Sequence, residues 1–205
     1  GKTEILIPMV AFVSEIVKTK ELIKEIKYEL DEEGIEYDKN IKVGIMVEIP
    51  GAVIILEKLL KHADFISIGT NDLIQYTLAV DRTNDKVNHL FQRMHPAVLE
   101  LIHKTISICN NSGKPVTVCG DMAEIPITAI LLLGMGLKNF SMTSNAIPDT
   151  KVILSNITFE QAKTFFNDIK LLSDSNEIRN YIIKHIKPLV TESIPSFKDA
   201  DIWVI

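Results

Sequence analysis

The strongest constraint on the fold is an alternation of short apolar runs with longer segments whose apolar residues recur at helical spacing. This alternation is typical of βαβ units, in which helices join parallel strands. Because the runs are almost continuously apolar, we expect strands that are buried on both faces. The predicted strands are Glu4–Met9, Val43–Ile49, Phe65–Gly69, Pro115–Cys119 and Asn139–Met142.

The segments between and after these runs carry the helical pattern. A short helix is also expected to start near Leu73, with Asn71 or Asp72 as its cap. The chain is therefore an α/β protein, but a closed (β/α)8 TIM barrel needs eight strands and typically ~250 residues. Periodicity leaves open whether this is a doubly wound open sheet or an incomplete barrel. The other predicted helices are Phe12–Glu33, Ala52–Lys61, Pro96–Cys109, Ile125–Leu133, Pro148–Ser155, Phe159–Lys170 and Glu177–Ile186.

Composition excludes several classes of protein. The net charge of −5, without a basic cluster interleaved with aromatic residues, argues against nucleic acid as a partner. No apolar run approaches the ~18–20 residues of a membrane span, so no membrane association is expected. Two cysteines do not make a disulfide framework, which favours a cytoplasmic location. The chain has no initiator Met and begins almost directly in a strand, so we expect a piece of a larger domain.

Acidic residues follow two successive predicted strands at the point where each ends. Glu48 closes one strand, and Asn71-Asp72 follows the next. The carboxyl ends of parallel strands form the site in such folds. An isolated Glu48 would be read as a salt bridge or as the cap of the helix near Gly51. With Asp72 at the equivalent point, a shared Mg2+ is favoured, because Mg2+ takes one or two carboxylates and completes its shell with water and phosphate oxygens.

Three other residues complete the predicted rim. The helix start at Asn71 offers N–H groups to an anion, and Arg82 offers a fork suited to phosphate or carboxylate, although alone it would be read as a surface arginine. Cys119 ends a strand and is either a small buried residue or a rim thiol. A thiol near carboxylates and phosphate stays protonated, which suits a proton donor. Cys109 falls in helical register with apolar residues and is expected in the core.

At these residues the sequence resembles the phosphoenolpyruvate-utilising enzymes. "QYTLAVDR" is more similar to enzyme I of the phosphoenolpyruvate:sugar phosphotransferase system than to pyruvate phosphate dikinase or phosphoenolpyruvate synthase. The resemblance runs from about residue 2 to residue 190, which leaves 191–205 as an irregular tail. The segments that carry it are "IPMV", "IMVEIP", "DFISIGTNDLIQYTLAVDR", "HPAVLELI", "GKPVTVCGDMA" and "LLLGMGLKNFSM".

The resemblance implies a fold, a cofactor and roles for the rim residues. The fold would be a TIM barrel that mediates dimerisation, of which this chain supplies strands four to eight. Glu48 and Asp72 would hold Mg2+, Asn71 with the Asp72 backbone would bind phosphoenolpyruvate, and Arg82 would grip its phosphate. Cys119 would protonate the enolate to give pyruvate. A separate N-terminal part would carry the phosphohistidine and dock the acceptor protein HPr.

The sequence also departs from the family pattern. Asp121 stands where the family usually has Glu, and Glu124-Ile125 follows it where the family has other residues. Two further phosphate-binding arginines and the phosphohistidine of the family lie outside this sequence. We therefore expect weak phosphoenolpyruvate binding and no phosphoryl transfer by this chain. One alternative is a Mg2+-dependent citrate-lyase-like aldolase or lyase, which would not need Arg82 or Cys119. The others are the C-terminal domain of pyruvate phosphate dikinase or phosphoenolpyruvate synthase, and a degenerate module without chemistry.

Overall fold

The computed structural model describes residues 3–198 and contains one five-stranded sheet in which every pair of neighbouring strands is parallel. All five predicted strands are present, each somewhat shorter than predicted, and the two outer ones lose the most. The first strand ends before Pro8, which has no N–H group to continue a ladder. The strands are β1 (Glu4–Ile7), β2 (Lys42–Val47), β3 (Ile66–Gly69), β4 (Val116–Cys119) and β5 (Asn139–Phe140).

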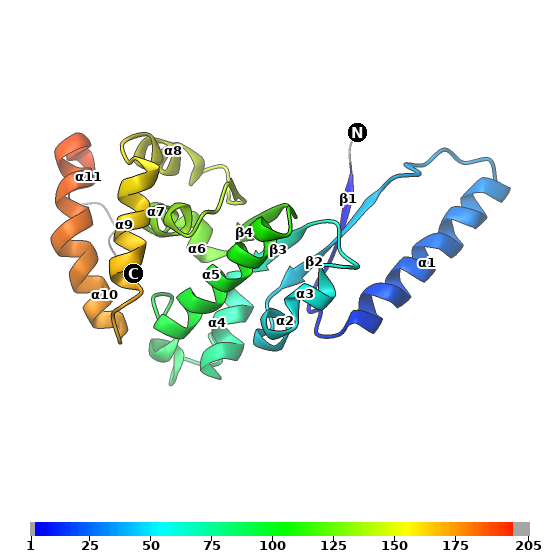
Figure 1. Ribbon diagram of the computed structural model, residues 1–205, viewed down its shortest axis with the longest axis horizontal. Coiled ribbons are helices and arrows are strands. Elements are labelled where there is room, and N and C mark those ends of the chain that lie inside the picture. Colours follow the sequence, from blue (N-terminus) through cyan, green and yellow to red (C-terminus); the bar gives the residue numbers. More distant parts are fainter. Residues whose placement is uncertain (1–2, 199–205) are drawn as a thin grey trace.

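The strand order distinguishes a barrel from a doubly wound sheet. The order is β1-β2-β3-β4-β5, with no reversal. A doubly wound sheet reverses its order once, at a switch point. Right-handed crossovers without a reversal place all connecting helices on the same face, which is the topology of a TIM barrel. Within residues 3–198, β1 and β5 each pair on one side only, so the strands form an incomplete barrel (Figure 1).

The predicted helices are present, with three local differences. The segment Ala52–Lys61 forms two short helices that are separated at Ile55. A π turn (Ile182–Ile186) links α10 to α11, and α11 extends into the predicted tail, whose residues 199–205 lie outside the described part. The helices are α1 (Val13–Glu32), α2 (Pro50–Ile54), α3 (Leu56–Leu59), α4 (Thr70–Leu78), α5 (Pro96–Asn111), α6 (Asp121–Glu124), α7 (Pro126–Gly134), α8 (Ile147–Ser155), α9 (Phe159–Ile169), α10 (Ser175–Tyr181) and α11 (Lys187–Ser193), with 3-10 turns at Asn88–Leu90 and Pro195–Phe197.

The two faces of the sheet differ in burial. On one face, the side chains of Ile45, Ile66 and Val118 are fully buried in the core. On the other face, Met46 and Thr117 remain partly exposed. The expectation of burial on both faces therefore holds for β3, in which every residue is buried, and was wrong for the other strands. The physical reason is the topology, because helices cover one face and the other face is the inner surface of the barrel.

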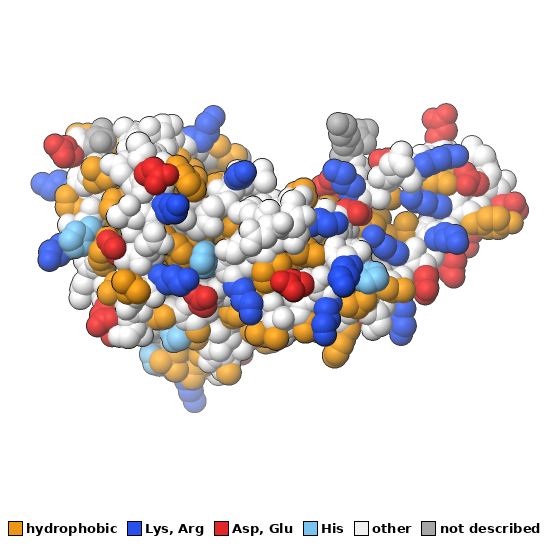
Figure 2. Space-filling view, viewed as in Figure 1, with side chains coloured by type: hydrophobic (Ala, Val, Ile, Leu, Met, Phe, Trp, Pro, Cys, Tyr) orange, Lys and Arg blue, Asp and Glu red, His pale blue; other side chains and the backbone are white. Residues whose placement is uncertain are grey.

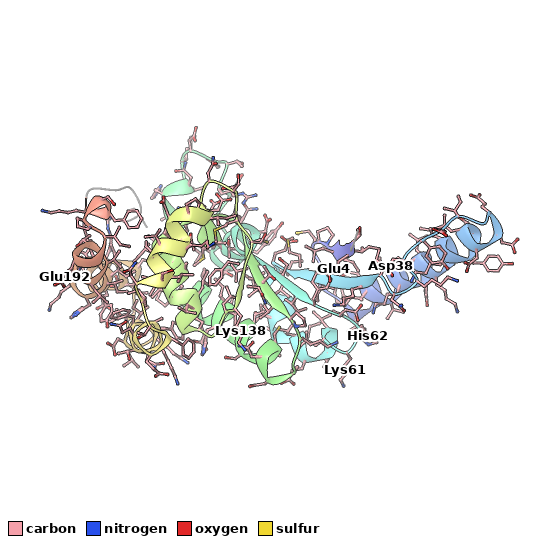
Figure 3. The ribbon with its side chains drawn as sticks, turned by 90° about the horizontal axis from the view of Figure 1, so that it is seen from above. Glu4, Asp38, Lys61, His62, Lys138 and Glu192 are labelled. Carbon is pink, nitrogen blue, oxygen red and sulfur yellow. The ribbon has the colours of Figure 1, made fainter. Side chains whose placement is uncertain are left out.

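The elements are arranged along one long axis. Helix α1 lies at one end and α10 and α11 lie at the other (Figure 1). Figure 3 labels Lys61, His62 and Lys138, which precede β3 and β5 and lie along the same side of the molecule. Because all neighbouring strands are parallel, their carboxyl ends share one edge of the sheet. Figure 2 shows basic and acidic side chains interspersed over the visible face. No helix among the described residues is both long and apolar enough to cross a membrane.

Candidate functional site

Glu48 is the most buried acid of the predicted rim. It follows β2 directly, and only 3% of its surface is exposed. Its Oε1 accepts a hydrogen bond of 2.7 Å from the backbone N–H of Met9, which lies in the loop after β1. A Cβ atom added to Gly69, at the end of β3, would lie 2.7 Å from Oε2 of Glu48. Three neighbouring strand ends therefore enclose this carboxylate.

The two predicted metal ligands lie together. Asp72 stands in the first turn of α4, directly after β3. Burial raises the pKa of Glu48 above its ordinary value, and the Met9 N–H group partly offsets this. The Asp72 carboxylate raises the pKa further, both by its negative charge and as a hydrogen-bond partner of Glu48. A bound cation would relieve the repulsion between these two carboxylates.

The donor set suits Mg2+ that is shared with a ligand. Among the described residues, no group of three or more His, Cys, Asp or Glu side chains is placed to hold a metal ion. Glu48 and Asp72 alone cannot fill the coordination shell of a metal ion. Two carboxylates are nevertheless what Mg2+ usually takes from a protein when water and phosphate oxygens fill its other positions.

Helix α4 begins earlier than predicted. It starts at Thr70 with Gly69 as its N-cap, so Asn71 and Asp72 lie in its first turn and neither of them caps it. The Thr70 hydroxyl donates a 2.9 Å hydrogen bond to the backbone carbonyl of Cys119. Gly120 has φ of +89°, and a Cβ atom there would lie 2.6 Å from Oγ1 of Thr70. These contacts fix the start of α4 against the end of β4.

Asn71, Asp121 and Arg93 form a chain of hydrogen bonds at this junction. Nδ2 of Asn71 donates to Oδ1 of Asp121 at 2.9 Å, and the Asp121 N–H donates to Oδ1 of Asn71 at 3.2 Å. Nη2 of Arg93 donates to Oδ2 of Asp121 at 3.0 Å. Burial alone would raise the pKa of Asp121. The hydrogen bonds from Asn71 and Arg93, with the charges of Arg93 and Arg82, outweigh burial and lower that pKa.

Arg93 was not predicted as a site residue. It lies in the irregular segment between α4 and α5, where no strand end or periodic pattern marks it. Its only sequence signal is its place two residues before His95, the N-cap of α5. That signal locates a helix start and does not indicate a contact with Asp121.

Arg82 lies beside Asp72, at the same edge of the sheet. Nη2 of Arg82 is 3.8 Å from Oδ1 of Asp72, and both side chains are partly exposed. Ala79 ends α4 in the left-handed conformation with φ of 54°, which turns the chain so that Arg82 returns towards the helix. The backbone N–H of Arg82 donates to Oε1 of Gln75 at 3.2 Å. A partly exposed guanidinium of this kind can bind an anionic ligand.

The two cysteines have different environments. Cys109 is fully buried on α5, and burial raises the pKa of its thiol to about 12, as expected for a core residue. Cys119 is half-buried and pairs with Gly69 across the sheet. Its Sγ donates to the Ile68 carbonyl at 3.3 Å and accepts from the Ser67 hydroxyl at 3.3 Å.

The strand ends therefore gather groups of complementary chemistry. One glycine, Gly69, separates Glu48 on one neighbouring strand from Cys119 on the other. Neighbouring strands lie about 4.8 Å apart, so these two backbones are roughly 10 Å from one another. The carboxylates suit a cation, the guanidinium suits a phosphate, and the thiol suits proton donation.

Comparison with known proteins identifies the family. Residues 1–159 match the family described as PEP-utilising enzyme, PEP-binding domain. The chain is 46% identical over 182 residues to the phosphoenolpyruvate-protein phosphotransferase of Buchnera aphidicola subsp. Acyrthosiphon pisum. The aligned residues make up 89% of this chain and 32% of that protein. It is 47% identical over 163 residues to the protein of the same name from Haemophilus influenzae, and this alignment includes 80% of this chain and 28% of that protein. The chain thus spans about a third of the length of these curated relatives.

A solved structure supports the fold. A citrate lyase from Burkholderia xenovorans LB400 superposes with a TM-score of 0.52 over 98% of this chain and 67% of that chain, at 16% sequence identity. At this low identity, the superposition shows a shared fold and carries no argument about function. The family match confirms the resemblance that the strand-end motifs carry. The chain belongs to the PEP-utilising enzyme family, as part of the PEP-binding domain.

Proposed function

We propose that this chain is the phosphoenolpyruvate- and Mg2+-binding part of a phosphoenolpyruvate-protein phosphotransferase, enzyme I of the sugar phosphotransferase system, and that it acts in the cytoplasm. The observation that carries the proposal is the juxtaposition of Glu48 and Asp72, with Arg82 beside Asp72 at the same edge. The names of the curated relatives support the same reaction.

The residues of the site would have different roles in binding the metal and the substrate. Glu48 and Asp72 would hold Mg2+, which when bound disperses the charge of the phosphoryl oxygens. Arg82 would bind the phosphate of phosphoenolpyruvate, and Asn71 would orient the substrate. Arg82 and Asn71 would also stabilise the negative charge that spreads over the phosphoryl group as it leaves.

Cys119 would complete the reaction by supplying a proton. When the phosphorus–oxygen bond breaks, the phosphoryl group would pass to a histidine nitrogen. The electron pair of the broken bond would stay on the enolate oxygen. The enolate then becomes a ketone as its methylene carbon takes the proton from Sγ of Cys119. The product is pyruvate, and water returns a proton to the sulfur. The half-buried position of Cys119 supports this role, because its sulfur remains partly accessible at the strand ends.

The partners belong to the longer protein. The phosphohistidine and the surface that docks HPr would lie outside this sequence, in the two thirds of the relatives that it does not cover. We also propose that residues 1–190 form the back of the barrel, that 191–205 form a C-terminal tail, and that the whole protein is a homodimer. The alternative, a citrate-lyase-like aldolase, would give Arg82 and Cys119 no role, and the fold shared with a citrate lyase carries no argument for it.

Binding of phosphoenolpyruvate and Mg2+ to this chain tests the proposal. We expect NMR titration to show saturable, Mg2+-dependent binding that Glu48→Ala abolishes. The matched control is Glu57→Ala, which changes an exposed acid on α3. Two missing arginine contacts would weaken binding by roughly 10²–10⁴ relative to the complete domain, so millimolar ligand is needed. Equal binding by Glu48→Ala, with or without Mg2+, would refute the proposal.

Phosphoryl transfer provides a second test. We expect no pyruvate from this chain with phosphoenolpyruvate and HPr, because no phosphohistidine is present to relay the phosphoryl group. Measurable pyruvate formation under these conditions would show that the division of roles is wrong.

A further inference from the structure

The carboxylate of Asp121 is bound on both of its oxygens. Asn71 donates to Oδ1 and Arg93 donates to Oδ2, at 2.9 and 3.0 Å. Asp121 is contributed by the start of α6, Asn71 by α4 and Arg93 by the segment before α5. Asn71 and Arg93 lie in the connection between β3 and β4, and Asp121 follows β4, so one acid joins two parts of that connection to the end of the next strand. The proposed function gives a substrate role to Asn71 alone.

These contacts leave the Asn71 carboxamide a single favourable orientation. Its NH2 group faces a carboxylate oxygen, while its oxygen faces the backbone N–H of Asp121. If the amide were flipped, oxygen would face oxygen and N–H would face N–H. In the observed orientation one hydrogen of Nδ2 is not used by Asp121. That hydrogen is available to an oxygen atom of a bound acid.

Arg93 is built into this junction and is not a mobile surface side chain. Only 33% of its side-chain surface is exposed, and its Nε is buried without a hydrogen-bond partner among the described residues. Its guanidinium lies 5.9 Å from the ring centre of Phe91. The Asp121 contact is thus the interaction that compensates for the partial burial of this cation.

We propose that Arg93 is a positioning residue of the substrate pocket, which acts through Asp121 to hold the Asn71 carboxamide with one N–H directed to an oxygen atom of the enol phosphate. This inference rests on the proposed function for the identity of the ligand. The orientation of the carboxamide itself depends only on the contacts described. Arg93 differs in this respect from Arg82, which lies beside Asp72 at the mouth.

The first experiment measures the carboxamide without any ligand. In the 15N-labelled chain, the side-chain NH2 signals of Asn71 report its hydrogen bond to Asp121. We expect Arg93→Met to shift these signals and to speed their exchange with solvent, and Arg93→Lys to restore them in part. Arg179→Met, which changes an exposed arginine on α10, should leave them unchanged. Backbone signals identify any variant that fails to fold. Unchanged Asn71 signals in a folded Arg93→Met chain would overturn the proposal.

The second experiment is a double-mutant cycle on phosphoenolpyruvate affinity in the presence of Mg2+. Loss of one charge-assisted contact should weaken binding by roughly tenfold in Arg93→Met. In an Asp121→Ala background, the same change should have no further effect, because Arg93 acts through Asp121. A persistent loss in that background would show direct contact with the ligand and overturn the positioning role.

The remaining outcomes are also distinguishable. Altered Asn71 signals with unchanged affinity would overturn the role in substrate binding. If the unaltered chain bound no phosphoenolpyruvate with Mg2+, the proposed function would fail, and the Asn71 signals alone would decide whether Arg93 orients the carboxamide.

Discussion

The carboxylate of Glu48 occupies the space that a side chain on residue 69 would need. A Cβ atom on Gly69 would lie 2.7 Å from Oε2 of Glu48 and 3.1 Å from its Cβ. Gly69 itself has ordinary backbone angles, so this glycine is required for close approach and not for an unusual conformation. The position of Glu48 next to Asp72 therefore depends on a missing side chain on the neighbouring strand.

Substitution of Gly69 by Ala should move Glu48 away from Asp72. We expect the free energy of unfolding to fall by about 1–3 kcal/mol from overpacking, and Mg2+ affinity to fall with it. Urea unfolding and Mg2+ titration measure the two effects. Gly51→Ala is the control, because the nearest atom to its new Cβ is 4.0 Å away. Unchanged Mg2+ affinity in Gly69→Ala would argue that Glu48 is not a ligand of the metal.

The raised pKa of Glu48 predicts a pH dependence of stability. The folded state binds this proton more tightly than the unfolded state, so the stabilisation is complete below the unfolded pKa and is lost as pH rises through the folded pKa. Glu48→Gln keeps an acceptor for the Met9 N–H group and never ionises. We therefore expect this variant to be more stable than the unaltered chain at pH 7, with the difference shrinking towards pH 4. Thermal unfolding across this range measures it.

Mg2+ should reverse that order of stability. At 10 mM Mg2+ and a dissociation constant of order 1 mM, linkage would stabilise the unaltered chain by about 1.4 kcal/mol at pH 7. Glu48→Gln loses one anionic ligand and should gain much less. An equal gain in both proteins would contradict the assignment of Glu48 as a ligand.

Arg82 should matter for binding and little for stability. Its ion pair with Asp72 spans 3.8 Å between partly exposed side chains, which is a weak arrangement. We expect Arg82→Ala to change the free energy of unfolding by less than about 1 kcal/mol. Phosphoenolpyruvate affinity should fall roughly 10- to 100-fold, because a charged contact to phosphate is lost. Arg179→Ala on α10 serves as the control, and equal affinities in the two variants would argue against a phosphate contact.

Cys119 can be tested without phosphoryl transfer. If its sulfur exchanges a proton with the methylene carbon of the enolate, the chain with Mg2+ should exchange the methyl protons of pyruvate for deuterium in D2O. Proton NMR follows this exchange. We expect Cys119→Ala to abolish it. Cys109→Ala, which alters the buried cysteine on α5, should lower stability but retain the exchange. Exchange at an undiminished rate in Cys119→Ala would assign the proton to another group.

Much of the site was predictable because it depends on strand ends. A strand that ends in an acid can be read from its apolar run, and parallel strands bring their carboxyl ends to one edge. That reasoning located Glu48, Asp72 and Cys119. It failed for the start of α4, because the Thr70 contact with the Cys119 carbonyl joins residues 49 positions apart. Periodicity describes local segments and contains no information about such a contact.

The sequence by itself determined the α/β class, the five strands and the acids and thiol at their ends, because burial and period are properties of neighbouring residues. Only the tertiary structure decided the strand order, the open inner face of the sheet and the place of Arg93. Nothing local marks that arginine, which reaches Asp121 across 28 positions from an irregular segment. Such a contact exists only after the strands have paired and brought the two segments together.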